Sequence, residues 1–231
     1  MIESNDFNVP DPRVKGQTMT RAKKLAFYAL AALVAGCVPI VSLRPLFTAD
    51  DIIFDEKLVG TWVEDPNDPK TTWVFSQLDE SAAQGILEPW KDEITKFYRL
   101  TLTDEEGRTG SFAACLLKLG ERRFLDVFPD RFPSGEQDME KMKLPYNGFF
   151  FQPVHTFLRV DALGEKLTLR MTDDDKFKEL VQAEPNAVKH EIVDDRPILT
   201  ASTKELQAFV TKYAADERLF PNDTTLTRKA K

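Results

Sequence analysis

Short runs of β-forming residues, each closed by turn residues, are the feature of this chain that most limits its fold. Val, Ile, Phe, Trp, Tyr and Thr fill the runs, and Gly, Pro, Asn and Asp separate them. We predict strands at Leu58–Val63, Thr71–Ser76, Lys96–Thr103, Ser111–Leu119, Arg123–Phe128, Phe149–Val160 and Lys166–Thr172, with Pro197–Thr200 as a further candidate. Short runs in close succession predict an antiparallel β-meander.

Turn chemistry and alternation support this pairing. Gly107 ends the turn 104–107 and Gly120 opens the next one, so both stand where a hairpin needs a positive φ. Apolar and polar side chains alternate along the runs 98–102 and 166–171. Each face of the sheet is therefore expected to be half wet.

Two helices are expected beside the sheet. Thr172 and three following aspartates predict a helix start, and an apolar stripe then runs to Pro185. Ser202 and Glu205 have the spacing of a capping box, followed by apolar residues at helical spacing. The predicted fold class is mainly β, of the α+β kind, with two short amphipathic helices. The segments 79–95 and 129–147 are longer insertions, and a small helix is expected in each, or a flap in the first.

The N-terminal segment has the pattern of an export signal. Arg21, Lys23 and Lys24 precede an uncharged run that begins at Leu25. The run closes on Leu-Val-Ala-Gly-Cys37, which resembles the bacterial lipobox. That resemblance implies that Cys37 carries a diacylglycerol thioether and that the leader is cut just before it. Two or more acyl chains form a firm membrane anchor. Met19 is an alternative start of the chain.

An uncleaved transmembrane helix is the alternative to a lipid anchor. The uncharged stretch continues to Leu43, close to the ~20 residues that a spanning helix needs, although Gly36 and Pro39 weaken it. The basic flank stays in the cytoplasm under both hypotheses, so the rest of the chain lies outside. Val38 stands where aspartate directs inner-membrane retention in some bacterial lipoproteins, which favours the outer membrane.

Four regions follow from these patterns. Residues 1–36 are an N-terminal extension and signal peptide, 37–56 a tether, 57–220 a β-rich globular domain and 221–231 a polar tail. The chain has a formal charge of −7, and the leader contributes +2, so the remainder carries −9. A surface this acidic repels phosphate and excludes a nucleic-acid partner.

Two resemblances extend the interpretation. Gly60-Thr61-Trp62 resembles the glycine-x-tryptophan signature of lipocalins, which implies a lipocalin-like barrel with Trp62 plugging one end. The Thr-Asp-Tyr stretch of that family is missing here. From Cys37 onward, most of the chain is similar to bacterial lipoproteins of about this length to which no activity has been assigned.

No common catalytic signature is present. The chain lacks a nucleophile elbow, a zinc-binding His pair, a Cys-x-x-Cys pair and a phosphate-binding glycine loop, so we predict no catalytic residue, metal or cofactor. His155 is interpreted as a partly buried or surface histidine, and Cys115 as a buried, inert thiol. Trp62, Phe149, Phe151 and His155 are the candidate contacts for a ligand or partner.

The leading functional hypothesis is an envelope lipoprotein with a non-enzymatic binding or structural role. It would face the periplasm, attach to the membrane through Cys37 and contact an envelope protein. The alternative is a lipocalin-like carrier of a small apolar ligand. An enzyme with an unfamiliar set of residues is the third hypothesis.

Overall fold

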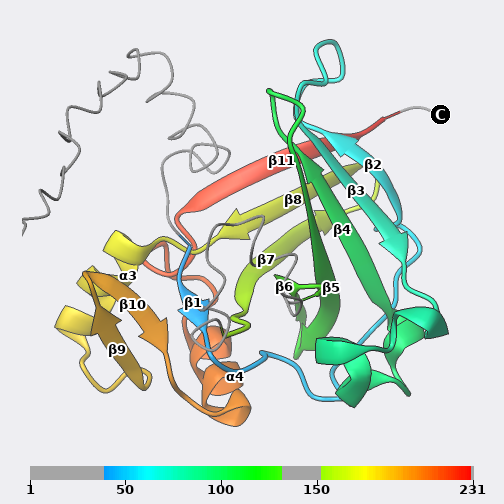
Figure 1. The fold of residues 1–231 in the computed structure, drawn as a ribbon. Helices are drawn as coiled ribbons and strands as arrows, with labels where there is room; N and C mark the ends of the chain where they lie inside the picture. Colours follow the sequence, from blue (N-terminus) through cyan, green and yellow to red (C-terminus); the bar gives the residue numbers. More distant parts are fainter. Residues whose placement is uncertain (1–38, 132–151, 230–231) are drawn as a thin grey trace, which may run out of the picture.

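The computed structural model describes residues 39–131 and 152–229. Within them, eight antiparallel strands close into a barrel in the order β11-β2-β3-β4-β5-β6-β7-β8 (Figure 1). The strands are β2 (Gly60–Val63), β3 (Thr72–Gln77), β4 (Phe97–Thr103), β5 (Thr109–Leu119), β6 (Arg122–Pro129), β7 (Thr156–Leu163), β8 (Lys166–Met171) and β11 (Asn222–Arg228). The predicted fold class, a mainly β protein with a lipocalin-like meander barrel, is confirmed.

The barrel interior is filled by apolar side chains from every strand. The alternation predicted along β4 and β8 is confirmed, because Leu100, Leu167 and Leu169 face inward and are at most 1% exposed. Both predicted hairpin glycines have positive φ, 75° at Gly107 and 60° at Gly120. The other fully enclosed interior residues are Leu58, Trp62, Phe75, Tyr98, Ala114, Leu116, Leu125 and Leu226.

A second core lies on the outside of the barrel, over β4 to β7. The three-stranded sheet β1-β10-β9 consists of β1 (Val41–Ser42), β10 (Arg196–Leu199) and β9 (His190–Val193). It packs here with α3 (Asp174–Ala183), α4 (Thr203–Lys212) and the 3-10 turns η1 (Glu80–Ala82), η2 (Gly85–Trp90) and η3 (Ile94–Lys96) (Figure 1). Segment 79–95 therefore packs on the barrel wall through Leu87 and Ile94.

This second core corrects the expectation that each sheet face is half wet. In β5, Leu116 points into the barrel while Cys115 and Leu117 point into the outer core, and all three are fully buried. Strands buried on both faces have nearly continuous apolar sequences instead of alternating ones. The run Phe-Ala-Ala-Cys-Leu-Leu in β5 has this character.

The predicted polar tail, residues 221–231, needs correction as well. Its residues Asn222–Arg228 form β11, which pairs with both β8 and β2 and so closes the barrel. The pattern is hard to detect because Leu226 is the strand's one large apolar side chain and faces inward. The threonines around it favour strands, and that was the available signal. Strands β1 and β9 were also missed.

Both predicted helices are present, with one change at a cap. Ser202 and Glu205 form the predicted capping box of α4. The cap of α3 is Asp173, whose carboxylate accepts the Lys176 N–H, and not Thr172. The Thr172 hydroxyl instead accepts the N–H of Ile40, and the threonine is fully buried there.

Candidate functional site

Trp62, the tryptophan of the Gly60-Thr61-Trp62 motif, lies in the core inside the barrel. Its indole is fully buried, and Nε1 donates to the Leu58 carbonyl at 2.9 Å. The guanidinium carbon of Arg228 lies 4.3 Å from the centre of the indole ring. A cation over an aromatic face is attractive, and more so when water is excluded. The last barrel strand is thereby locked to the first.

Arg228 also explains the glycine before Trp62. Its Nη1 donates to the Val59 carbonyl at 2.7 Å, and its Nη2 donates to the Lys57 carbonyl. Gly60 has a φ of 139°, and a Cβ added there would lie 2.4 Å from Arg228 Nη1. The positive φ favours glycine, and a larger residue would also displace the Arg228 guanidinium.

His155 is held by a buried carboxylate. Its Nδ1 lies 2.8 Å from Asp126 Oδ1, and the Asp126 side chain is fully buried on the outer face of β6. The other carboxylate oxygen accepts the N–H of Leu46 at 2.7 Å. The imidazole also packs beside Phe128, with ring centres 4.8 Å apart. Asp126 and His155 therefore form a buried polar clamp whose partners are all inside the protein.

This clamp fixes a segment that we call the strap, residues 40–53. Ile40, Leu46, Phe47 and Ile52 of the strap are each at most 5% exposed. The residues predicted to be a tether, 37–56, are thus packed on the barrel from Ile40 onward. The Phe47 ring lies among Trp90, Phe97 and Phe128, with centres 4.8 to 6.1 Å away.

Backbone hydrogen bonds hold the strap at both ends. Ser42 exchanges two hydrogen bonds with the backbone of His155, at 2.8 and 2.9 Å. Farther along, Ile53 donates to Leu116 and Lys118 donates to Asp51, so the strap extends the sheet beside the end of β5. Side chains of α4 add contacts, since Gln207 donates to the Leu46 carbonyl. The strap is an integral part of the fold.

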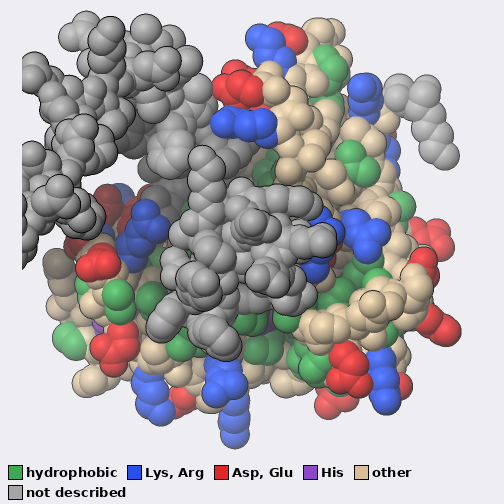
Figure 2. Space-filling view, viewed as in Figure 1, with side chains coloured by type: hydrophobic (Ala, Val, Ile, Leu, Met, Phe, Trp, Pro, Cys, Tyr) green, Lys and Arg blue, Asp and Glu red, His purple; other side chains and the backbone are tan. Residues whose placement is uncertain are grey.

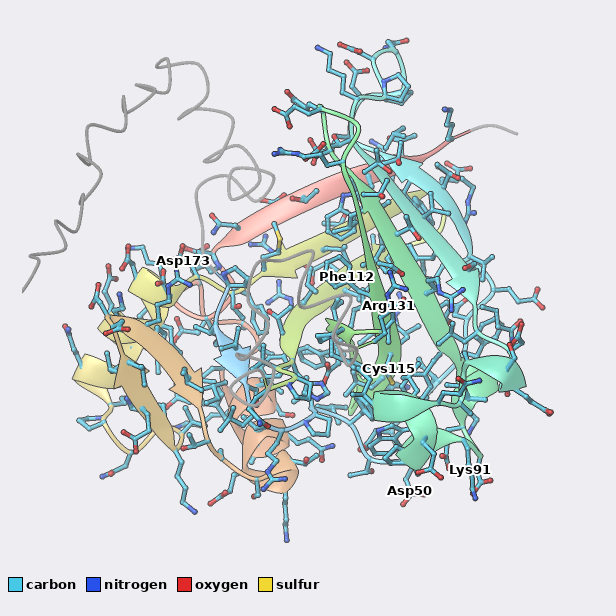
Figure 3. All side chains as sticks on the ribbon, in the orientation of Figure 1. Asp50, Lys91, Phe112, Cys115, Arg131 and Asp173 are labelled. Atoms are coloured by element: carbon cyan, nitrogen blue, oxygen red, sulfur yellow. The ribbon has the colours of Figure 1, made fainter. Side chains whose placement is uncertain are left out.

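Cys115 lies beneath the strap on β5, with Phe112 farther along the same strand (Figure 3). The thiol is fully buried, and burial, followed by the charges of Asp126 and Asp51, raises the pKa of Cys115 well above its usual value. Because the thiolate is the nucleophilic form, this environment suppresses reactivity. The side chain fills space in the outer core.

Two further predicted contacts, Phe149 and Phe151, lie outside the described residues, as does Cys37. Trp62 and His155 are described and lie in different places, one inside the barrel and one on its outer wall. The partners of these residues, Asp126 for His155 and Arg228 for Trp62, were not predicted from the sequence. A lone acid in the apolar run Phe-Leu-Asp-Val-Phe was a signal, because a buried acid needs a partner.

Across residues 39–131 and 152–229, no group of three or more His, Cys, Asp or Glu side chains is placed to hold a metal ion. None of the helices in these residues has the length and apolarity to span a membrane. Comparisons of the chain with protein-family models, with curated proteins and with solved structures find no match.

Proposed function

We propose that this protein is an envelope lipoprotein, anchored by lipid on Cys37, whose barrel is a binding or structural module and not an enzyme. The observation that carries the proposal is the strap. Because Ile40 is already buried in the fold, only Val38 and Pro39 separate the candidate lipid site from the domain. The module is held directly at the membrane, on the periplasmic side and by preference at the outer membrane.

The strap also weighs against an uncleaved transmembrane helix. The uncharged stretch from Leu25 to Leu43 includes residues 40–43, and the fold uses these as part of the strap and of β1. The 15 residues from Leu25 to Pro39 remain, and as a helix they would be about 22 Å long. The hydrocarbon core of a bilayer is about 30 Å thick, and apolar runs of this shorter length are typical of signal peptides.

A non-enzymatic role is supported by what the reactive side chains do. The carboxylate of Asp126 holds His155 and Leu46, and the thiol of Cys115 is enclosed by apolar side chains. These groups stabilise the strap and the outer core. The same architecture gives a rigid module with a fixed attachment point, which suits binding or scaffolding.

Metabolic labelling tests the anchor. Cells that produce the full chain are grown with an alkyne fatty acid, and the protein is isolated and coupled to a fluorophore. We expect labelling of wild type and of Cys115→Ser at equal levels, and none of Cys37→Ser. Unlabelled wild type, or labelling that survives Cys37→Ser, would contradict the proposal. Isolation of a tagged copy from cross-linked envelopes then tests the binding role, with one dominant partner protein expected.

A carrier of a small apolar ligand is the second candidate, and the barrel fold supports it. Most of the interior is filled by packed side chains, so a ligand would have to enter where the interior side chains are less completely buried. Leu102 and Phe112 face inward there and are only partly buried. An environment-sensitive apolar dye should bind there, and Phe112→Arg should abolish its binding. Equal dye affinity of wild type and Phe112→Arg would exclude the carrier function.

A further inference from the structure

The exposed large apolar side chains of the described residues gather on one small sheet. They are Leu43, Ile192 and Val193, at 45%, 49% and 51% exposure, and all belong to the β1-β10-β9 sheet or follow it directly. In Figure 2, apolar side chains reach the surface at lower left, over β9 and β10. Single exposed apolar residues are ordinary, but a cluster indicates a surface that meets something apolar.

The register of this sheet separates its two faces. Ser42 and Leu199 are paired neighbours, fully buried against the barrel. Val41 pairs with Ile198 and Val193 with Arg196, and these residues alternate with the buried ones, so they point outward. The outward face therefore carries Val41, Leu43, Val193 and Ile198, together with Glu191 and Arg196.

This face also lies at the point where the described chain begins. One hollow on it is lined by apolar residues, among them Pro39, Val41, Val193 and Ile198, and by the charged Asp174, Asp194 and Arg196. Ile40 is fixed from both sides, because its N–H donates to Thr172 and its carbonyl accepts the Thr156 hydroxyl, each at 3.2 Å. Three residues of extended chain reach at most about 11 Å. A group attached to Cys37 is thus never farther than this from Ile40.

We propose that the outward face of the β1-β10-β9 sheet rests on the lipid bilayer, with Leu43 and Val193 at the level of the headgroups; Ile192 pairs with Pro197 and belongs to the other face. This inference rests on the proposed anchor at Cys37. Because the chain from Cys37 to Ile40 spans at most ~11 Å, an anchor at Cys37 holds the sheet close to the membrane surface. Exposed apolar side chains gain free energy by entering the interface.

The charges around the face indicate which lipid surface fits. Asp194 and Asp195 form the tight β9–β10 turn, with φ values of 47° and 64°. Lys178 of α3 bonds Asp195 and Asp175, each at 3.1 Å, and also lies 3.8 Å from Asp174. One lysine facing three carboxylates leaves this edge acidic. Anionic headgroups would be repelled, so we assign the contact to zwitterionic lipid.

Spin labels on the mature lipoprotein, reconstituted in phosphatidylcholine vesicles, test this orientation. One label is attached at Val193→Cys and a control label at Glu105→Cys, an exposed position in the β4–β5 turn, far from the sheet (Figure 1). Buried Cys115 should take no label. We expect collisions with oxygen to be favoured over collisions with a water-soluble nickel chelate at residue 193, and the reverse at residue 105. Phosphatidylglycerol in the vesicles should reduce the difference.

Equal exposure of both labels to the nickel chelate would overturn the orientation. Broadening between labels at residue 193 that disappears on dilution with unlabelled protein would also overturn it, because the face would then cover a second copy. Intact mass of the same preparation tests the anchor separately. An unacylated chain that keeps its leader would refute the lipid anchor. The spin labels would still report the orientation of the sheet, because the retained leader would then attach the chain to the membrane. A chain that is never recovered with membranes refutes both.

Discussion

Asp126, at the centre of β6, accepts the backbone N–H of Leu46 at 2.7 Å, across 80 positions of the sequence. The carboxylate is completely enclosed and also holds His155. Together with the backbone hydrogen bonds at Ser42, Asp51 and Ile53, this contact joins the segment that follows the candidate lipid site to the barrel wall.

Asp126→Ala should destabilise the fold. The substitution leaves the Leu46 N–H and the His155 imidazole without their buried acceptor, at a cost of about 2–4 kcal/mol in the free energy of unfolding. Urea unfolding followed by tryptophan fluorescence measures this. Asp50→Ala removes an exposed carboxylate from the same strap and should change stability by less than about 0.5 kcal/mol. Equal effects of the two substitutions would show that the clamp does not hold the strap.

Gly60 and Arg228 should be energetically coupled. Gly60→Ala brings a Cβ against Arg228 Nη1 and strains a backbone with φ of 139°, so we expect a loss of about 2–3 kcal/mol. Arg228→Ala removes the cation over Trp62 and two hydrogen bonds to carbonyls, and should cost about 1–3 kcal/mol. The double variant should lose less than the sum, because the steric clash is absent. Strict additivity in a double-mutant cycle would contradict the contact.

Ionisation of Tyr98 should lower the stability of the fold at alkaline pH. Burial raises the pKa of Tyr98 from 10 to about 12, while the Asp55 backbone N–H, 2.7 Å from the hydroxyl, opposes this shift. Between pH 10 and about 12, Tyr98 therefore keeps its hydroxyl proton in the folded state and releases it in the unfolded state. The stabilisation is complete below pH 10 and is lost as the pH rises towards about 12. Tyr98→Phe should flatten that part of the curve in urea titrations, and an unchanged slope would rule out this residue as the cause.

Thiol titration provides a count of free cysteines. In the native mature protein, buried Cys115 should not react with a thiol reagent at pH 8, because its pKa is raised and the reagent cannot reach it. After unfolding in guanidinium we expect one reactive thiol per chain, since the chain has 2 cysteines and the proposed lipid would block Cys37. Two reactive thiols would mean that Cys37 is unmodified.

Local sequence signals predicted most of the barrel, because alternation and hairpin glycines are short-range features. Gly107 and Gly120 lie at the turns where the pattern placed them, and Ser202 and Glu205 cap α4 as their spacing predicts. The amphipathic helix α4 covers the barrel wall, as its apolar stripe indicates.

Long-range pairings were not predictable in this way. Asp126 meets Leu46 and Arg228 meets Trp62 across separations that no local pattern encodes. β11 carries a single large apolar side chain, Leu226, so its strand character depends on neighbours on both sides. The strap contains Pro45 and has no regular alternation, and it is ordered by its contacts with the barrel and α4.

The mass of the intact protein from membranes tests the central claim most directly, that the chain is cut before Cys37 and acylated there. Mass spectrometry of wild type should give a chain that begins at Cys37 and carries a diacylglycerol group and, in most bacteria of this type, a further acyl chain. Cys115→Ser should give the same product, lighter only by the substitution. A full-length wild-type chain without acyl groups, unchanged in Cys37→Ser apart from the substitution, would contradict the claim.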